Sequence, residues 1–250
     1  MYLTGMKKQL PIVRILSVLC LVSLVALPVR AAKLSVVELF TSQGCSSCPP
    51  ADDLLRELSE KENILALSFS VDYWNYLGWK DIFAKPEFTQ RQKDYSRTLS
   101  HGGVYTPQMI INGRSAVVGS RRDLVAKYLA AQREIPVAGP DISLAFQEGM
   151  INLTIGNGSV NEPATIWLVA YDDKRSVKIK SGELAGQTRD YSNVVRSLKQ
   201  IGSWIGREVM LSLDPAKVAA EKCDNYAVLV QDKDTGAILS AARVRLGSPS

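Results

Sequence analysis

The chain has 250 residues, a formal net charge of +5 and 46% hydrophobic residues. Its first 32 residues contain four basic side chains and no acidic one, so the remaining 218 residues carry a net charge of only +1. No basic stripe remains that would indicate a nucleic-acid-binding protein. This length suits one large domain or two ordinary ones.

Residues 1–32 have the three parts of a secretory signal peptide. Met1 to Arg14 is basic, Ile15 to Val29 is an apolar run, and Arg30-Ala31-Ala32 offers small residues for cleavage. The apolar run is shorter than the about 20 residues that span a membrane. We therefore expect an exported protein, periplasmic in a bacterium or secreted, with no membrane segment after cleavage.

The elements predicted for residues 33–136 alternate between strands and helices. Short apolar runs at Val36 to Phe40 and Ile64 to Val71 are typical of buried strands. Pro50 to Leu58 has apolar residues at helical spacing, with proline in the first turn. A polar helix from Lys85 to about Leu99, a hairpin from Val104 to Gly119 and a helix from Arg121 to Arg133 complete the order. This order predicts a mixed sheet covered by helices.

The pattern changes after Ile135 to Pro140, a stretch rich in proline and glycine that indicates a domain boundary. Beyond it, apolar residues alternate with period two in short runs separated by turn residues. These runs predict an antiparallel β-sandwich over residues 141–247. Asp190 to Gly206 is expected to be an insert that is not a strand.

The candidate site is Cys45-Ser46-Ser47-Cys48, between the first strand and the first helix. At the start of a helix, free N–H groups and the helix dipole favour a thiolate. In an exported protein, such a pair is expected to form a disulfide or to cycle through one. Cys45 would then form a mixed disulfide with a substrate, and Cys48 would resolve it. The alternative is a structural disulfide, although so short a loop gains little chain entropy.

Three other residues are candidates for chemistry. Glu38 lies in an apolar strand and, if buried without a partner, could carry the proton that Cys48 must lose; otherwise it is salt-bridged or surface-facing. His101 could join the two cysteines at a soft metal such as copper, or lie in a solvated loop. Cys223 leaves an odd cysteine count and could be a small buried residue or a third participant.

Aromatic residues are concentrated in a loop after the second predicted strand. They could form an apolar platform that receives a partner protein, or they could pack as core and lid residues. The residues concerned are Tyr73, Trp74, Tyr76 and Trp79.

Two motifs in residues 34–133 resemble the thioredoxin-like superfamily: Cys45 to Cys48 after the first strand, and Thr106-Pro107 before the hairpin. This resemblance implies a cis proline at Pro107 that faces the dithiol, docks substrate backbone and keeps metal off the cysteines. More closely, the chain is similar to the DUF1223 family, secreted bacterial proteins of unknown function. The similar segments are Val37 to Asp52, Val71 to Trp74, Leu77 to Asp81, Tyr105 to Met109 and Asn193 to Arg196. With this resemblance, the predicted fold is an α/β thioredoxin-like domain followed by an antiparallel β-sandwich domain.

The leading hypothesis is a thiol–disulfide oxidoreductase that acts on protein thiols or disulfides, or on a redox partner protein. Its catalytic residues would be Cys45, Cys48 and Glu38, and its substrate-binding residues would be Thr106, Pro107, Trp74 and Tyr73. No cofactor, metal or nucleic acid is expected. Two alternatives stay open: a non-catalytic binding module with a structural disulfide, and a copper carrier that uses the same cysteines.

Overall fold

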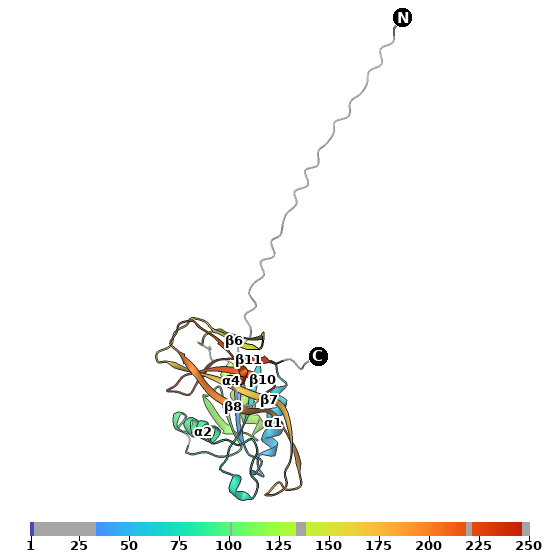
Figure 1. Ribbon diagram of the computed structural model, residues 1–250, viewed down its shortest axis with the longest axis vertical. Coiled ribbons are helices and arrows are strands. Elements are labelled where there is room, and N and C mark those ends of the chain that lie inside the picture. The colour runs from blue at the N-terminus through green and yellow to red at the C-terminus, as the bar shows by residue number, and fades with distance from the viewer. Residues whose placement is uncertain (3–33, 101, 134–138, 219–221, 247–250) are drawn as a thin grey trace. The chain divides into compact units, whose positions relative to one another are not determined.

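All described helices and strands lie in residues 32–250, one of the two units of the chain; the other is Met1–Ala31. The structure is a computed structural model that describes residues 1–2, 34–100, 102–133, 139–218 and 222–246 (Figure 1). Apart from Met1 and Tyr2, the predicted signal peptide lies outside the described residues, as do His101 and residues 135–138 of the predicted boundary.

The elements predicted before residue 134 are confirmed. They are β1 (Ser35–Thr41), α1 (Pro49–Ser59), β2 (Ile64–Ser70), α2 (Pro86–Thr98), β3 (Gln108–Ile111), β4 (Ser115–Val118) and α3 (Arg122–Arg133), with a 3-10 helix, η1 (Asn75–Leu77), in the aromatic loop. Because side chains alternate along β1, Val37 and Leu39 pack with α1 and α3, whereas Val36 and Phe40 pack with α2.

The second half is mostly strands. They are β5 (Ile142–Gln147), β6 (Met150–Ile155), β7 (Ala164–Lys178), β8 (Thr188–Trp204), β9 (Val209–Leu213), β10 (Asn225–Gln231) and β11 (Ile238–Arg245), with a short helix α4 (Pro215–Val218). The expectation that Asp190 to Gly206 is not a strand is wrong, because most of this segment is β8. Residues Tyr191 to Val195 are buried on both faces of the sheet, so the period-two signal is lost there.

The predicted fold class, an α/β thioredoxin-like domain followed by a β-sandwich domain, is wrong. Strands from both halves form one mixed sheet of eight strands in the order β11-β10-β7-β8-β2-β1-β3-β4, and β5, β6 and β9 form a second sheet of three. The halves join where β8 runs parallel to β2 at Ser68 and Val194. The Asn193 side chain strengthens this junction by donating from Nδ2 to the Ala66 carbonyl at 2.8 Å.

The core is also shared between the halves. Phe40 and Phe69 of the first half pack in one cluster with Tyr171, Val195 and Leu229 of the second. The opposite faces of β7 and β10 pack on the three-stranded sheet. The turn after β3 contacts the start of β11, where the Ile238 N–H donates to the Asn112 carbonyl at 2.9 Å. Because β11 is at one edge of the large sheet and β3 is near the other, this contact shows that the sheet curves.

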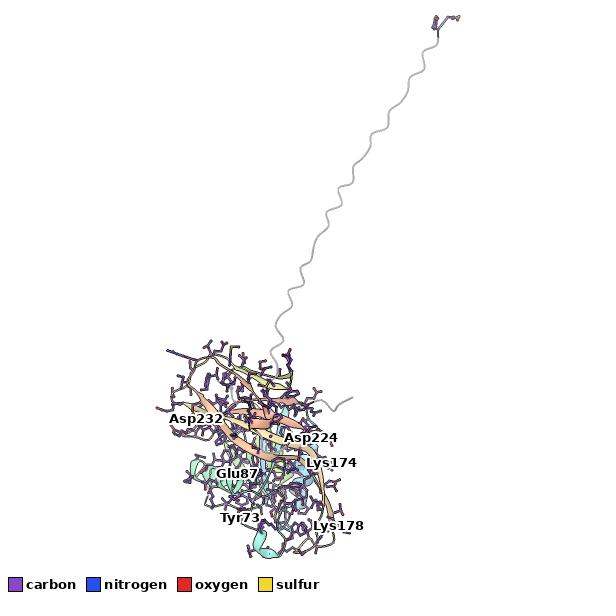
Figure 2. The ribbon with its side chains drawn as sticks, in the orientation of Figure 1. Tyr73, Glu87, Lys174, Lys178, Asp224 and Asp232 are labelled. Atoms are coloured by element: carbon purple, nitrogen blue, oxygen red, sulfur yellow. A yellow bond between two sulfur atoms is a disulfide. The ribbon has the colours of Figure 1, made fainter. Side chains whose placement is uncertain are left out.

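The β7–β8 hairpin extends beyond the shared sheet. Its strands stay paired as far as Lys178 and Thr188, well past the last β10 partner of β7 at Tyr171. Figure 2 shows Lys178 at the same end of this unit as Tyr73 of the aromatic loop. The hairpin thereby brings residues from the second half to the end where β1 leads into α1.

Candidate functional site

Cys45 and Cys48 form a disulfide at the start of α1, which confirms the predicted pairing. The chain leaves β1 through a turn closed by the Cys45 N–H, which donates to the Ser42 carbonyl at 3.1 Å. Cys48 is the N-cap residue, and proline follows it in the first helical turn. Both cysteines are buried, at 1% and 0% exposed, whereas Ser46 and Ser47 are exposed.

Two hydroxyl groups lie within hydrogen-bond distance of the Cys45 sulfur. Thr106 donates from Oγ1 to Cys45 Sγ at 3.2 Å, and Ser47 Oγ lies 3.3 Å from the same sulfur. Thr106 is held in turn by Trp74, whose Nε1–H donates to Thr106 Oγ1 at 2.7 Å. The peptide bond between Thr106 and Pro107 is cis, as expected from the resemblance. Trp74 and Thr106, two of the predicted substrate-binding residues, thus form a chain of contacts that ends at the disulfide.

The turn before Cys45 is fixed by buried polar contacts. The Gln43 N–H donates to Asp81 Oδ2 at 2.9 Å, and Trp79 Nε1–H donates to Gln43 Oε1 at 2.8 Å. Burial raises the pKa of Asp81, against hydrogen bonds that lower it. At Gly44, an added Cβ would meet Trp74 at 3.3 Å, so a larger side chain has little room there.

Asp52 lies buried on the helix face that also carries Cys48, four residues earlier. The Thr41 hydroxyl donates to its Oδ1 at 2.8 Å. Burial raises the pKa of Asp52 from its ordinary 3.8 to about 7, although the hydrogen bond from Thr41 lowers it. Asp52 is not among the residues predicted from the sequence for this site. Its position one turn after a buried cysteine was the signal for a different assignment.

Glu38 lies elsewhere, on the face of β1 that packs with α2. Its carboxylate accepts two hydrogen bonds from Arg91, at 2.5 and 2.9 Å, and one from the Tyr95 hydroxyl at 2.6 Å. Burial alone would lower the pKa of Arg91, but the Glu38 charge raises it. Glu38 is thus buried with partners, and these contacts do not connect it with Cys48. Its role in proton transfer stays a prediction.

Of the four aromatic residues in the loop after β2, three are half-buried and one is exposed. Tyr73 donates from its hydroxyl to Gln92 Oε1 at 3.2 Å, and burial raises the pKa of Tyr73 to about 12. Tyr76, in contrast, is 79% exposed. Trp74 and Trp79 are half-buried and donate to the site residues described above.

The β7–β8 hairpin supplies residues that the sequence analysis did not assign to the site. The Ser46 N–H, between the two cysteines, donates to Glu183 Oε2 at 3.1 Å. Arg189 donates from Nη2 to the Pro49 carbonyl at 3.3 Å, and it lies 3.7 Å from Asp53. Glu183 is 137 positions from Ser46, so only the pairing of β7 with β8 could have indicated this contact.

The third cysteine does not join this site. Cys223 is buried in the core between the two sheets. His101 is outside the described residues, and within them no group of three potential ligands is placed to hold a metal ion. Among the described helices, none is long and apolar enough to cross a membrane.

The architecture and the disulfide define a class of β-rich proteins with a two-cysteine turn at a helix start. The chain is similar to a protein from Agrobacterium tumefaciens of known crystal structure, with 37% sequence identity and a TM-score of 0.77; the match covers 88% of this chain and 97% of that chain. HBP35 of Porphyromonas gingivalis shares the fold, at 12% identity and a TM-score of 0.61, over 86% of this chain and 76% of that chain. No curated protein matches the chain.

DUF1223, described as a protein of unknown function, matches residues 36–231. The chain therefore belongs to the DUF1223 family, as the sequence resemblance indicated. The matched range runs from β1 to the end of β10 and includes both cysteines, Thr106 and Glu183.

Proposed function

We propose that the protein is a thiol–disulfide oxidoreductase whose redox centre is the Cys45–Cys48 disulfide. One observation carries this proposal: hydroxyl groups lie within hydrogen-bond distance of Cys45 Sγ at the start of a helix. A hydrogen bond and the positive end of a helix dipole both stabilise a thiolate more than a thiol. This arrangement therefore favours Cys45 as the nucleophile and leaving group of thiol–disulfide exchange.

The exchange runs through a mixed disulfide. In the reducing direction, the Cys45 thiolate attacks a substrate disulfide, forms a bond to one sulfur and releases the other as a thiolate. Cys48, after losing its proton, attacks Cys45 Sγ and releases the second substrate sulfur. Two electrons pass from the protein dithiol to the substrate, and the Cys45–Cys48 bond forms again. The oxidising direction is the reverse.

Asp52 is the carboxyl group that best fits the proton transfer. It is buried on the helix face of Cys48, and a carboxyl with a pKa near 7 can both accept and return a proton at neutral pH. Glu38 is the weaker candidate because its oxygens are engaged by Arg91 and Tyr95.

The proposed similarity to thioredoxin-like proteins is limited to the cysteine turn and to Thr106-Pro107. We also propose that Thr106 and Pro107 bind the backbone of the substrate, beside Trp74 and Tyr73. The proposed partners are protein thiols or disulfides. The basic and apolar segments of residues 1–32 support export to the bacterial periplasm or beyond.

Burial of both cysteines favours a second candidate, a non-catalytic binding module with a structural disulfide. A sulfur in a residue that is 1% exposed can be attacked only if neighbouring groups move or a small thiol enters. The exposed Tyr76 would then belong to a recognition surface.

A redox titration separates the two candidates. The full chain after residue 32 is equilibrated in graded glutathione buffers, free thiols are alkylated, and mass spectrometry counts the reduced Cys45–Cys48 pairs. A Cys223→Ser variant provides the control for the third thiol. A midpoint between about −270 and −120 mV supports the oxidoreductase, as in known two-cysteine redox proteins. A midpoint below about −300 mV identifies a structural disulfide and overturns the proposal.

A further inference from the structure

In the described part of the chain, Glu183 is the one acidic residue whose carboxylate contacts the segment between the two cysteines. The Ser46 N–H donates to Glu183 Oε2 at 3.1 Å. Because Ser46 follows Cys45 directly, covalent geometry limits the distance from this oxygen to Cys45 Sγ to about 8 Å.

The turn that carries Glu183 is anchored on both sides of this residue. Ser181 donates from Oγ to the Gly78 carbonyl at 2.6 Å, and Gly182, at φ +81°, lies against Trp79. After Glu183, the buried Leu184 packs in a cluster with Phe83. The turn that carries the carboxylate is therefore held beside the cysteines by these contacts, although Glu183 itself is exposed.

We propose that Glu183 shifts the redox equilibrium of the Cys45–Cys48 pair toward its disulfide form. The inference rests on the proposed function, since only a cycling pair has a working equilibrium. Reduction places a negative charge on Cys45 when its thiol ionises, and a carboxylate at this distance repels that charge. The same carboxylate occupies a backbone N–H that could otherwise turn toward a thiolate. Both effects disfavour the reduced state.

Other charged groups lie around the same turn, so the effect is measured as a difference between variants. They are Asp52 and Asp53 on α1, Asp81 before α2 and Arg189 on β8. Solvent screens a charge that is as exposed as Glu183. We therefore expect a modest effect, about a threefold change in the acid dissociation constant of Cys45.

The test compares Glu183→Gln with the unchanged chain and with Glu162→Gln. Glu162 is exposed and precedes β7, so it lies at the other end of a strand roughly 45 Å long, and its loss changes the net charge equally. In the glutathione titration, two glutathione thiols reduce each protein disulfide and become one glutathione disulfide. We expect Glu183→Gln to make the pair about threefold easier to reduce, or about 15 mV more oxidising for a two-electron couple.

A second measurement follows the ultraviolet absorbance of the Cys45 thiolate against pH in the reduced proteins. Glu183→Gln should lower the pKa of Cys45, and the difference should shrink at about 1 M ionic strength, where the screening length is about 3 Å. A merely structural role would not give this salt dependence. Unfolding temperatures of the oxidised proteins check that both variants keep the fold.

The outcomes for the two proposals can be told apart. If Glu183→Gln matches Glu162→Gln in both measurements, the role of Glu183 is overturned while a midpoint in the working range still supports the oxidoreductase. If all midpoints lie below about −300 mV, the proposed function fails. The acidity of Cys45 in the reduced proteins then decides whether Glu183 acts on the sulfur at all.

Discussion

At the scale of single residues, the hydroxyl of Thr106 is the group that acts most directly on Cys45. We expect Thr106→Val to raise the pKa of Cys45 in the reduced protein. Valine has nearly the shape of threonine but no hydroxyl, so the thiolate loses a hydrogen-bond donor. A hydrogen bond to a charged group contributes about 1.5 kcal/mol, so the acid dissociation constant should fall about tenfold. Thiolate absorbance against pH measures it. Thr106→Ser keeps the hydroxyl and is the control; equal acidity in the two variants would contradict the role of the hydroxyl.

Asp52 makes stability depend on pH. Its pKa is about 7 in the folded protein against an ordinary 3.8, so the folded state holds the proton more tightly than the unfolded state. This group therefore favours folding below about pH 4, and the benefit is lost as the pH rises through 7. We expect Asp52→Asn to be more stable than the unchanged chain at pH 8, by up to about 4 kcal/mol.

The measurement for Asp52 is the free energy of unfolding in urea at several pH values. Asp53→Asn is the matched control because Asp53 is the next residue and half of its side chain is exposed. The gain from Asp52→Asn should be confined to pH above about 4. A gain that is the same at every pH would show that burial of the charge is not its cause.

At the scale of elements, Glu38 joins β1 to α2 through Arg91, and Gln231 joins Arg91 to β10. We expect Glu38→Gln to cost about 3–5 kcal/mol, since it leaves the buried Arg91 charge without its counter-charge. Urea unfolding measures the loss, and Glu38→Gln with Arg91→Met should recover part of it. An unchanged free energy of unfolding in Glu38→Gln would contradict this role of the ion pair.

The sequence predicted most elements and part of the candidate site. The periodicity of apolar residues predicted β1, α1 and β2, and the hairpin predicted from Val104 to Gly119 contains β3 and β4. Periodicity missed β8, whose central residues are buried on both faces, and it could not show that β8 pairs with β2 through Val194. Cys45, Cys48 and Thr106 were found because they lie in short motifs. Glu183 was missed because its contact depends on a pairing between distant strands.

At the scale of the whole molecule, residues of the second half pair with the strands of the first half and cover their apolar side chains. The β11 residue Arg243 donates to the carbonyls of Ile64 and Glu62, both at 2.9 Å, where β2 begins. The shared cluster covers Phe40 and Phe69 with residues from β7 and β10. The hairpin from the same half reaches the cysteine turn at Ser46. Stability and the environment of the disulfide therefore depend on one continuous sheet.

This dependence predicts that residues 34–133 will not fold alone. Without residues 139–246, the face of β1 and β2 that carries Phe40 and Phe69 loses its partners from β7, β8 and β10, and the β2 edge at Ser68 loses β8. Exposed apolar surface of this kind favours aggregation or a loosely packed state. We expect the fragment to show no cooperative thermal unfolding, whereas the chain from residue 34 to 250 unfolds in one transition. A fragment that unfolds cooperatively and keeps slow amide exchange in β1 would instead identify a domain boundary near residue 136.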